Sequence, residues 1–297
     1  MSATYFLRRL AVLGVAVSLA ACQTAGQQGQ LGQNGQQQVQ VTAPAPAVVA
    51  YAPAATAVTR GYSEYVMDLA NGTELSQLNA EGPRFPASLT KMMTLYLLFE
   101  EVSSGRYSLS SELAVSDKAA RQPPAKLGLK VGSTITVEQA ARALAVKSAN
   151  DVAVVIAENV SGSESAFAAK MTAKARALGL SRTRFVNASG LPNPAQVTTA
   201  RDMATLGRAL KTRFPQYGAY FRAKTFSFGG RTYKTTNNLL GKVPGVDGLK
   251  TGHINAAGYN LVATANRGGK KRLVVVMGGK SEAARDKRVT ELLEQNF

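Results

Sequence analysis

Two residue types that build many metal sites are nearly missing from this sequence of 297 residues. It has one cysteine, Cys22, and one histidine, His253. One cysteine cannot form an intramolecular disulfide, and it cannot build a cysteine-based zinc site. One histidine excludes a centre in which several histidines hold a metal. We therefore expect a protein that works without a metal and without another cofactor.

Acidic residues are scarce relative to basic ones. There are 18 Asp and Glu against 35 Lys and Arg, which gives a formal net charge of +17. Such a charge attracts anionic partners of any kind. The basic residues are scattered, with no basic helix, no zinc-finger spacing and no aromatic–basic RNA motif, so we expect no nucleic-acid partner. Hydrophobic residues make up 45% of the chain, enough for a large buried core, which excludes a disordered protein.

The first 22 residues contain no apolar run long enough to span a membrane. Arg8 and Arg9 precede the apolar stretch Leu10–Ala20, whereas a spanning helix needs about 20 apolar residues. A short positive region followed by a short apolar one predicts an export signal over residues 1–22. Its end, Leu19-Ala20-Ala21-Cys22, resembles the lipobox of bacterial lipoproteins. The alternative is an ordinary signal peptide that ends by chance before a cysteine.

The lipobox resemblance implies a lipid on the Cys22 thiol and a periplasmic protein held at a membrane by that lipid. An uncharged residue after the cysteine, here Gln23, favours the outer membrane over the inner one. Half of the residues from Gln23 to Gln40 are glutamine, and few side chains up to residue 59 are large enough to bury. Residues 23–59 are therefore predicted to be a disordered tether, and residues 60–297 the folded domain.

The folded domain is predicted to open and close with strands and to carry helices between them. Asn71-Gly72 is a strong hairpin turn, and apolar residues recur at helical spacing from Ser88 to Val102. The other predicted helices are Val137–Leu144, Asn150–Asn159, Glu164–Leu178, Ala200–Lys211 and Glu282–Gln295, and the strands are Tyr62–Asp68, Thr73–Leu78, Lys224–Phe228, the segment around residues 250–252, Gly258–Ala265 and Arg272–Met277. This order predicts a mixed α/β (α+β) domain.

Three short motifs occur in order along the domain: Ser88-Leu89-Thr90-Lys91, Ser148-Ala149-Asn150 and Lys250-Thr251-Gly252. Residues three apart share a helix face, so Ser88 places a hydroxyl beside the amine of Lys91. Burial and a second cation, Lys250, would lower the pKa of Lys91 and let it take the proton of Ser88. Backbone N–H groups at the helix start favour negative charge that develops there.

Each motif also has a plain structural interpretation. Ser88 is a residue type that caps helices, with Lys91 as a solvated first-turn residue, and Asn150-Asp151 could cap the next helix in the same way. The run Lys250-Thr251-Gly252 could be a surface turn. The three interpretations together do not explain the sequence well, because the sequences that flank the motifs also match one family. Met92 and Met93 are interpreted as core residues.

The three motifs are a set shared by penicillin-binding proteins and class A β-lactamases. Over residues 60–297 the sequence resembles the D-alanyl-D-alanine carboxypeptidases, which are low-molecular-mass penicillin-binding proteins. The segments that carry this resemblance are Pro86–Thr94, Phe185–Ala204, Val246–His253 and Ala257–Val262. It implies a β-lactamase/transpeptidase-like fold, with a central antiparallel sheet flanked by helices and a helical subdomain inserted between the early and late strands.

The resemblance also implies a role for each motif residue. Ser88 would form the acyl intermediate, with Lys91 as its base. Ser148 would relay a proton to the leaving amine, and Asn150 would hold a substrate amide. The strand residues Lys250 and Thr251 would bind the terminal carboxylate of the substrate.

Two further positions follow from the same resemblance. Gly252 would let the substrate backbone approach closely, and the N–H of His253 would join that of the nucleophile in binding the oxyanion. The imidazole of His253 is expected to position groups rather than to act as the base. Strand alternation sends Lys250 and Gly252 to one face and Thr251 to the other, so an edge position or a local twist must bring them to one pocket.

The implied activity is that of a serine-type D-Ala-D-Ala carboxypeptidase that removes terminal D-Ala from peptidoglycan stem peptides. Between Asn150 and Lys250 there is no Glu-x-x-Leu-Asn, the sequence that β-lactamases of class A use for deacylation. We therefore expect β-lactams to be covalent inhibitors that leave slowly. The alternatives are a DD-endopeptidase that cleaves peptidoglycan cross-links and a catalytically weak lipoprotein that binds the cell wall.

Overall fold

The computed structural model describes residue 58 and residues 61–297 of the chain. The predicted export signal, the lipidation site Cys22 and the tether lie outside the described residues, so these remain predictions. Within the described part of the chain, no helix combines the length and the apolar composition needed to cross a membrane.

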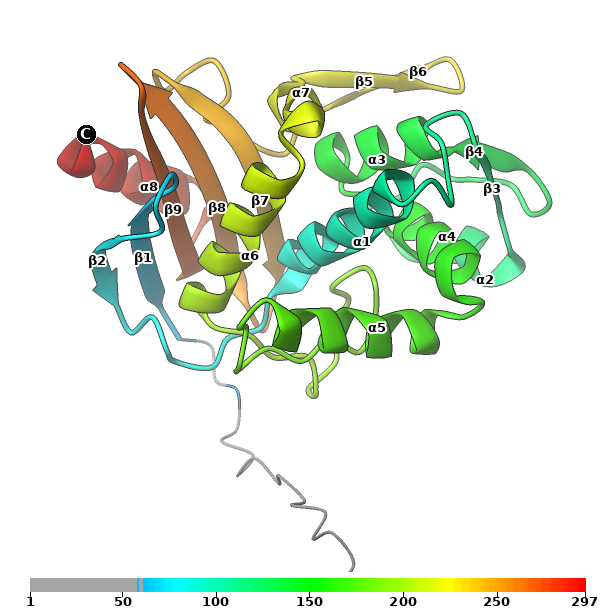
Figure 1. Cartoon of the computed structure of the whole chain (residues 1–297), viewed down its shortest axis with the longest axis horizontal. Coiled ribbons are helices and arrows are strands. Elements are labelled where there is room, and N and C mark those ends of the chain that lie inside the picture. The colour runs from blue at the N-terminus through cyan, green and yellow to red at the C-terminus, as the bar shows by residue number, and fades with distance from the viewer. Residues whose placement is uncertain (1–57, 59–60) are drawn as a thin grey trace, which may run out of the picture. The chain divides into compact units, whose positions relative to one another are not determined.

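A five-stranded antiparallel sheet forms one side of the domain, in the order β2-β1-β9-β8-β7 (Figure 1). Its strands are β1 (Ser63–Asp68), β2 (Glu74–Leu78), β7 (Val246–Ile254), β8 (Gly258–Arg267) and β9 (Lys270–Gly279). The first two pair across the predicted Asn71-Gly72 turn, and Gly72 has a φ of 84° that suits glycine. Because β9 joins β1 to the last strands, residues far apart in the sequence share one sheet.

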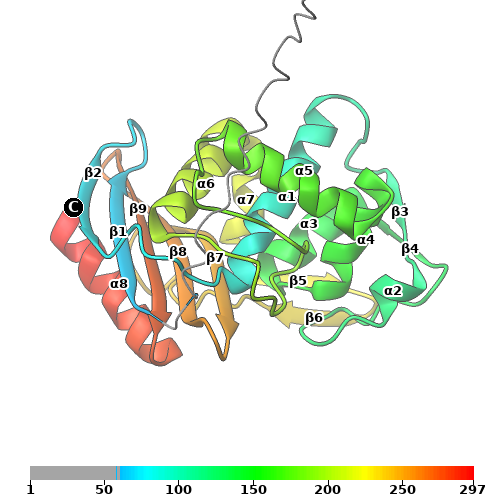
Figure 2. The same cartoon turned by 90° about the horizontal axis from the view of Figure 1, so that it is seen from below.

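Both faces of the sheet are buried, which is why its central strands are apolar at successive positions. Val66, Leu261 and Val276 pack with Leu292 of α8 (Glu282–Asn296) on one face. Side chains that alternate with them pack on the other face against α6 (Ala200–Arg213), which in turn contacts α1 (Lys91–Ser103). The two views agree that α8 and α6 lie on opposite sides of the sheet (Figures 1 and 2).

The helical part of the domain lies between β2 and β7 in the sequence and beside the sheet in space (Figure 1). At its centre is α1, whose residues 91–99 are all buried, as a helix that is apolar on every side must be. Around it lie α2 (Asp117–Ala120), α3 (Val137–Val146), α4 (Asn150–Ser161), α5 (Glu164–Ala177), α7 (Gly218–Arg222) and the 3-10 turn η2 (Pro215–Tyr217). This arrangement confirms the predicted fold class.

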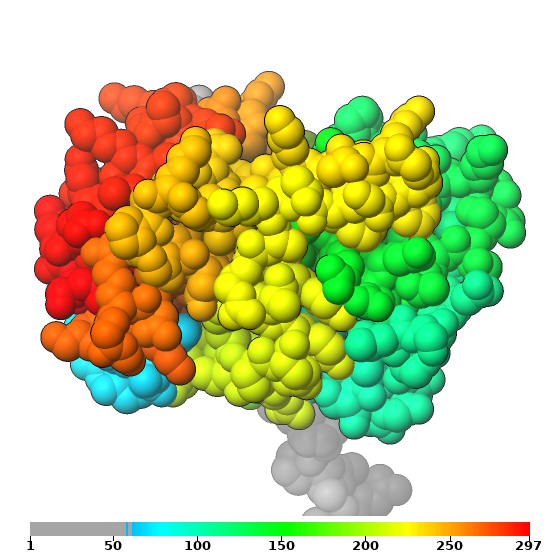
Figure 3. Space-filling model, turned by 90° about the horizontal axis from the view of Figure 1, so that it is seen from above, coloured from blue at the N-terminus to red at the C-terminus, as the bar shows by residue number. Residues whose placement is uncertain are grey.

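The strand predicted at Lys224–Phe228 is not part of the central sheet. Residues Thr225–Phe228 form β5, which pairs only with β6 (Arg231–Lys234) in a separate hairpin. Its stacked rings Phe226, Phe228 and Tyr233 belong to the core of the helical part, so this short strand is stabilised by packing over α3. The hairpin lies across the surface of the helical part in Figure 3. A second small sheet joins β3 (Glu112–Ala114) to β4 (Thr134–Thr136).

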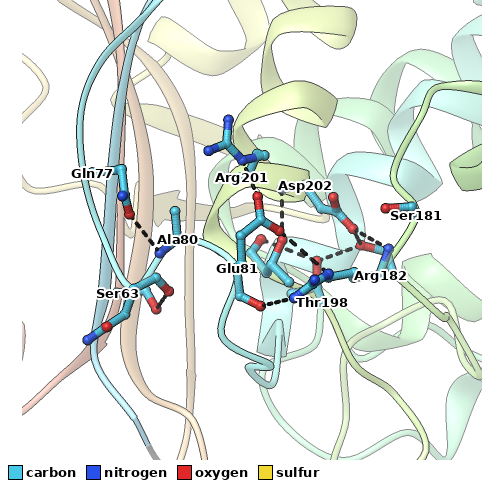
Figure 4. Close-up of polar contacts among 12 residues, drawn as sticks. Ser63, Gln77, Ala80, Glu81, Ser181, Arg182, Thr198, Arg201 and Asp202 are labelled. Atoms are coloured by element: carbon cyan, nitrogen blue, oxygen red, sulfur yellow. Dashed lines mark hydrogen bonds and ion pairs between the residues drawn. The ribbon is translucent and has the colours of Figure 1, made fainter. Parts of the chain in front are cut away.

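The helix predicted from Ser88 begins with a 3-10 turn, η1 (Ala87–Thr90), and continues as α1. The segment that leads into this turn is fixed to the start of α6 (Figure 4). There Glu81 forms ion pairs with Arg182 and Arg201. Nearby, the buried carboxylate of Asp202 accepts hydrogen bonds from Thr183 Oγ1 at 2.6 Å and Arg182 N at 3.1 Å. These contacts limit movement of the chain just before η1.

Candidate active site

The first motif places a hydroxyl and an amine in contact. Lys91 Nζ donates to Ser88 Oγ at 3.0 Å, which confirms that the two side chains share a face. The same amine donates to Asn150 Oδ1 at 2.8 Å and to the carbonyl oxygen of Ser189 at 2.5 Å. Lys91 is fully buried and Ser88 half-buried, so the hydroxyl faces outward from the amine that holds it.

The surroundings of Lys91 favour its neutral form. Burial lowers the pKa of Lys91 well below its ordinary value, and the positive charge of Lys250 lowers it further, against an opposing effect of Asp151. An amine that has lost its proton can accept one from the Ser88 hydroxyl. The predicted effect of a second cation is thus present, although burial is the larger cause.

The third motif supplies the second cation and joins it to the second motif. Lys250 Nζ donates to Ser148 Oγ at 2.9 Å and to its neighbour's carbonyl, Thr251 O, at 3.0 Å. Burial, and then the positive charge of Arg285, lower the pKa of Lys250 to about 7. Ser148 lies in the predicted loop between α3 and α4, with a φ of 62° that turns the chain at this point. The motifs therefore provide two neighbouring hydroxyl–amine pairs.

The strand that carries Lys250 is an edge strand of the sheet, which is one of the two possibilities, an edge position or a local twist, expected from strand alternation. Lys250 and Gly252 project to the face that meets the helical part, whereas Thr251 Oγ1 meets Thr236 Oγ1 at 2.6 Å. A Cβ at Gly252 would lie 3.0 Å from Ser88 N. Glycine at this position thus lets the backbone of the nucleophile approach β7 closely.

A cleft of about 320 Å³ opens above these groups, within the size range of small-molecule sites. Of the predicted site residues, six line it: Ser88, Ser148, Asn150, Thr251, Gly252 and His253. Lys91 and Lys250 lie buried behind them, within hydrogen-bond distance of the two serines. The structure thus brings together all eight predicted residues of the described chain.

Asn150 and His253 have contacts that the sequence did not predict. The amide nitrogen of Asn150 donates to Pro123 O at 3.0 Å while its oxygen accepts from Lys91, so this side chain ties the base to a neighbouring loop. The ring of His253 stacks on Tyr259 with centroids 4.1 Å apart. Stacking fixes the imidazole as part of the wall, in agreement with a positioning group.

The plain interpretations of the motifs are wrong. The residue that caps α1 is Thr90, and no side chain, that of Ser88 included, makes a capping hydrogen bond at η1 or α1. Asn150 is the first residue of α4 rather than its cap, and Lys250-Thr251-Gly252 lies within β7 rather than in a turn.

Several groups at the site were missed by sequence reasoning. Arg285 of α8 is 2% exposed and lines the cleft together with Glu282. No local pattern marks it, because one arginine in a helix of many charged residues has no distinguishing signal. The carbonyl of Ser189 belongs to the backbone and has no side-chain signal at all. Gly190, which follows it, lay within the segment that carries the family resemblance.

Gly190 packs against the chain that leads into the nucleophile. It has a φ of 85°, and a Cβ there would lie 1.9 Å from Ala87 O. We expect Gly190→Ala to displace Ser88 and to slow its acylation about 100-fold, since a shift of about 1 Å can have such an effect. The matched control is Gly105→Ala. Gly105 has a similar φ of 78°, but a Cβ there would have no atom within 4 Å, so this substitution should cost only about 1 kcal/mol of backbone strain. Equal acylation rates in the two variants, measured with a fluorescent penicillin, would contradict this packing argument.

A family model described as D-alanyl-D-alanine carboxypeptidase, peptidase family S11, matches residues 50–281 of the chain. The chain is 36% identical over 259 residues to the D-alanyl-D-alanine carboxypeptidase DacD of Salmonella typhimurium, covering 84% of this chain and 66% of that protein. It is 36% identical over 242 residues to the carboxypeptidase DacA of Escherichia coli, covering 79% of this chain and 60% of that one. The chain thus spans less than two thirds of the length of these relatives.

Solved structures show the same fold. The structure of penicillin binding protein 5 from Haemophilus influenzae matches with a TM-score of 0.77 and 33% identity, covering 80% of this chain and 71% of that one. Penicillin-binding protein D2 from Listeria monocytogenes, in its ampicillin-bound form, matches with a TM-score of 0.69 and 32% identity, covering 80% of this chain and 96% of that one.

Proposed function

The chain belongs to the D-alanyl-D-alanine carboxypeptidase family of serine peptidases, and from that premise we propose that it removes the terminal D-Ala from peptidoglycan stem peptides. One observation carries the proposal: the amine of a fully buried lysine, whose pKa is lowered, lies 3.0 Å from a serine hydroxyl that lines a cleft. This is the arrangement of an activated nucleophile beside its base.

Acylation would begin when Ser88 Oγ attacks the carbonyl carbon of the bond between the two D-Ala residues. The proton of the hydroxyl passes to the neutral amine of Lys91, and a C–O bond forms as the carbonyl becomes an oxyanion. The backbone N–H groups of Ser88 and His253 would bind this oxyanion, and Gly252, which precedes His253, lies against the backbone of Ser88.

Collapse of this intermediate breaks the C–N bond, and the leaving amine must receive a proton. Ser148 would relay to this amine the proton that Lys91 took up, because its hydroxyl accepts from Lys250 and faces the same cleft. The carboxylate of the departing D-Ala would lie near Thr251, with the charges of Lys250 and Arg285 behind it. Water then hydrolyses the acyl ester and restores the Ser88 hydroxyl.

Penicillins would acylate Ser88 by the same route and leave slowly. The one carboxylate among the residues that line the cleft is Glu282, on α8 beside Arg285. That position is on the side of the leaving carboxylate, so Glu282 is poorly placed to activate water against the acyl ester. The ampicillin-bound form of the Listeria protein supports β-lactams as ligands of this chain.

The location of the protein is part of the proposal. The resemblance of Leu19-Ala20-Ala21-Cys22 to a lipobox supports a periplasmic lipoprotein with a lipid on Cys22, and Gln23 supports the outer membrane. Mass spectrometry of the mature N-terminus tests it: a diacylglyceryl cysteine at position 22 is expected, and an unmodified cysteine or another cleavage site would refute it.

Treatment of purified peptidoglycan fragments, followed by mass analysis, tests the activity. Loss of one alanine mass from pentapeptides is expected, with cross-linked dimers left intact. Conversion of dimers to monomers would instead identify an endopeptidase. Labelling by a fluorescent penicillin with neither product would identify a catalytically weak binding protein.

The charge of Lys250 predicts a pH dependence of substrate binding. Its pKa is lowered to about 7, so the amine is protonated below that pH and neutral well above it. Loss of a charged contact to the substrate carboxylate is expected to raise KM up to about tenfold between pH 6 and pH 9. The control is the same peptide with a C-terminal amide, whose KM should change far less. A KM that does not change with pH for the peptide with a free C-terminal carboxylate would contradict this role of Lys250.

A further inference from the structure

One wall of the cleft is a loop that is fixed to the start of α4. Pro124 and Ala125 of this loop line the cleft opposite β7. Asn150 holds it at two points, since its backbone N–H donates to Ala125 O at 2.7 Å and its side-chain nitrogen to Pro123 O at 3.0 Å. The wall and the residue that contacts Lys91 are therefore one connected unit.

The next residue, Asp151, binds the other end of the same loop. Its Oδ1 accepts from Leu127 N at 3.1 Å, and its Oδ2 accepts from Gly128 N at 2.8 Å and Leu129 N at 3.3 Å. The N–H of Val152 also donates to Oδ1, at 2.9 Å. The side chain is fully buried. Both oxygens accept from backbone donors, which is the pattern of a carboxylate, since a protonated oxygen would need an acceptor.

A buried carboxylate is costly unless its charge is compensated. Among the ion pairs of the described chain, none involves Asp151, so its compensation comes from the four backbone N–H groups and from the field of more distant charges. The cation that this field acts on is Lys91, where Asp151 opposes the combined effect of burial and Lys250.

We infer that Asp151 is a positioning residue of the active site, which holds the 123–129 wall of the cleft and supplies the negative charge that balances Lys250 at Lys91. The charged groups around Lys91 define this balance. Lys250 faces it from β7 and Asp151 from α4, while the Ser189 loop presents a carbonyl. Arg285 of α8 acts through Lys250. Lys147, His253 and Glu282 lie farther out, on the lining of the cleft.

The balance has a functional consequence. Lys91 must be neutral to accept the proton of Ser88, but it must also hold that proton until the leaving amine is ready. Burial and the charge of Lys250 together lower the pKa of Lys91 and so make its amine a weaker base. The charge of Asp151 opposes these two effects and raises the pKa of Lys91, and the same carboxylate holds residues 127–129 of the wall.

The inference rests on the proposed function only through acylation of Ser88, so the test measures the rate of labelling by a fluorescent penicillin against pH. In the full-length protein, Asp151→Asn should move the acid limb of the profile to lower pH by about one unit, because the charge that raises the pKa of Lys91 is lost while Asn150 still holds the amine. The plateau should also fall, since an amide nitrogen faces the backbone donors of residues 127–129 and loosens the wall.

Two variants separate charge from contact. Asp151→Glu keeps the charge but cannot keep the short hydrogen bonds, so its plateau should fall while its acid limb stays near that of the wild type. Asp117→Asn removes an exposed carboxylate of the short helix α2, and its profile should match the wild type within about 0.2 pH unit, since screened surface charges act weakly. The role of the charge would be overturned if the acid limb of Asp151→Asn stayed at the wild-type pH. It would also be overturned if the acid limb of Asp151→Glu moved as far as that of Asp151→Asn.

Hydrogen exchange in the wild-type protein is a measurement that does not depend on the folding of any variant. The amide hydrogens of Leu127, Gly128 and Leu129 should exchange slowly together, because each is bound to the buried carboxylate. Fast exchange of all three would overturn the anchoring of the wall. Absence of penicillin labelling in the wild type would instead overturn the proposed function, so the two failures are distinguishable.

Discussion

Ser88→Ala is expected to abolish labelling by a fluorescent penicillin and to reduce D-Ala release by about 10⁴-fold or more, since the nucleophile of a covalent mechanism cannot be replaced by a neighbouring group. The other serine that lines the cleft, Ser148, is held by Lys250 and cannot take over the attack. Labelled protein resolved on a gel measures the acylation, and mass analysis of a pentapeptide measures the turnover.

A matched serine substitution shows that the loss is chemical. Ser189→Ala removes the hydroxyl that accepts from Leu191 N at 3.4 Å but leaves the backbone carbonyl that accepts from Lys91. It should retain labelling at the wild-type rate within a few-fold. Because Ser88 Oγ is bound by Lys91 at a half-buried position, its removal should change the free energy of unfolding by only about 1 kcal/mol. Equal labelling of Ser88→Ala and the wild type would refute the acyl-enzyme mechanism.

The central sheet was predictable because its strands have strong local signals. The turn at Asn71-Gly72 fixes the first hairpin, and β8 and β9 are long apolar segments that only a buried position can accommodate. The pairing of β1 with β9 has no such signal. The paired residues are about 200 positions apart in the sequence, and the packing of α6 and α8 on the two faces of the sheet brings them together. A short stretch of sequence does not show such packing.

The segment 224–228 shows that a local signal can predict a strand without predicting its partner. It has the aromatic and polar alternation of a strand, and it is a strand, but its partner is the adjacent β6 rather than the sheet. Phe226 is buried against the helical part of the domain. Tertiary packing, rather than the local alternation, therefore determines where this strand lies.

For the site, the sequence predicted local neighbours by geometry and distant ones only by resemblance. Ser88 and Lys91 are three residues apart, so helical spacing alone puts them in contact. The contacts of Lys91 with Asn150 and of Lys250 with Ser148 cross 59 and 102 positions of the chain. Nothing in their spacing requires them to meet, and the family resemblance was the warrant for that prediction.

Groups that act through the backbone or through charge at a distance could not be predicted at all. Every residue type has a backbone carbonyl, so the sequence does not distinguish that of Ser189. Only the fold shows that it faces Lys91. Asp151 had the ordinary interpretation of a helix cap. Its position against three N–H groups of a separate loop is visible only once α4 and residues 127–129 are placed together.

Lys91→Met is expected to lower the rate of acylation about 10³-fold, within the range that a positioned general base contributes. Methionine is unbranched and of similar length, so it fills the buried space without an amine. Lys91→Arg should be as inactive, because a guanidinium stays protonated in proteins and cannot accept the proton of Ser88. In the wild type the lowered pKa of Lys91 means that acylation rises with pH through that pKa and then levels off. The two variants should lack this rise.

The control for Lys91 is Lys147→Met, which removes a lysine from the lining of the same cleft. Lys147 Nζ lies 5.6 Å from the ring of Tyr233 and has no contact with the nucleophile among the described hydrogen bonds, so its loss should leave labelling within a few-fold of the wild type. A pH profile of Lys91→Met that retains the wild-type rise would place the base elsewhere. Since Lys250 titrates near pH 7 and is joined to Ser148, it would then be the group to test next.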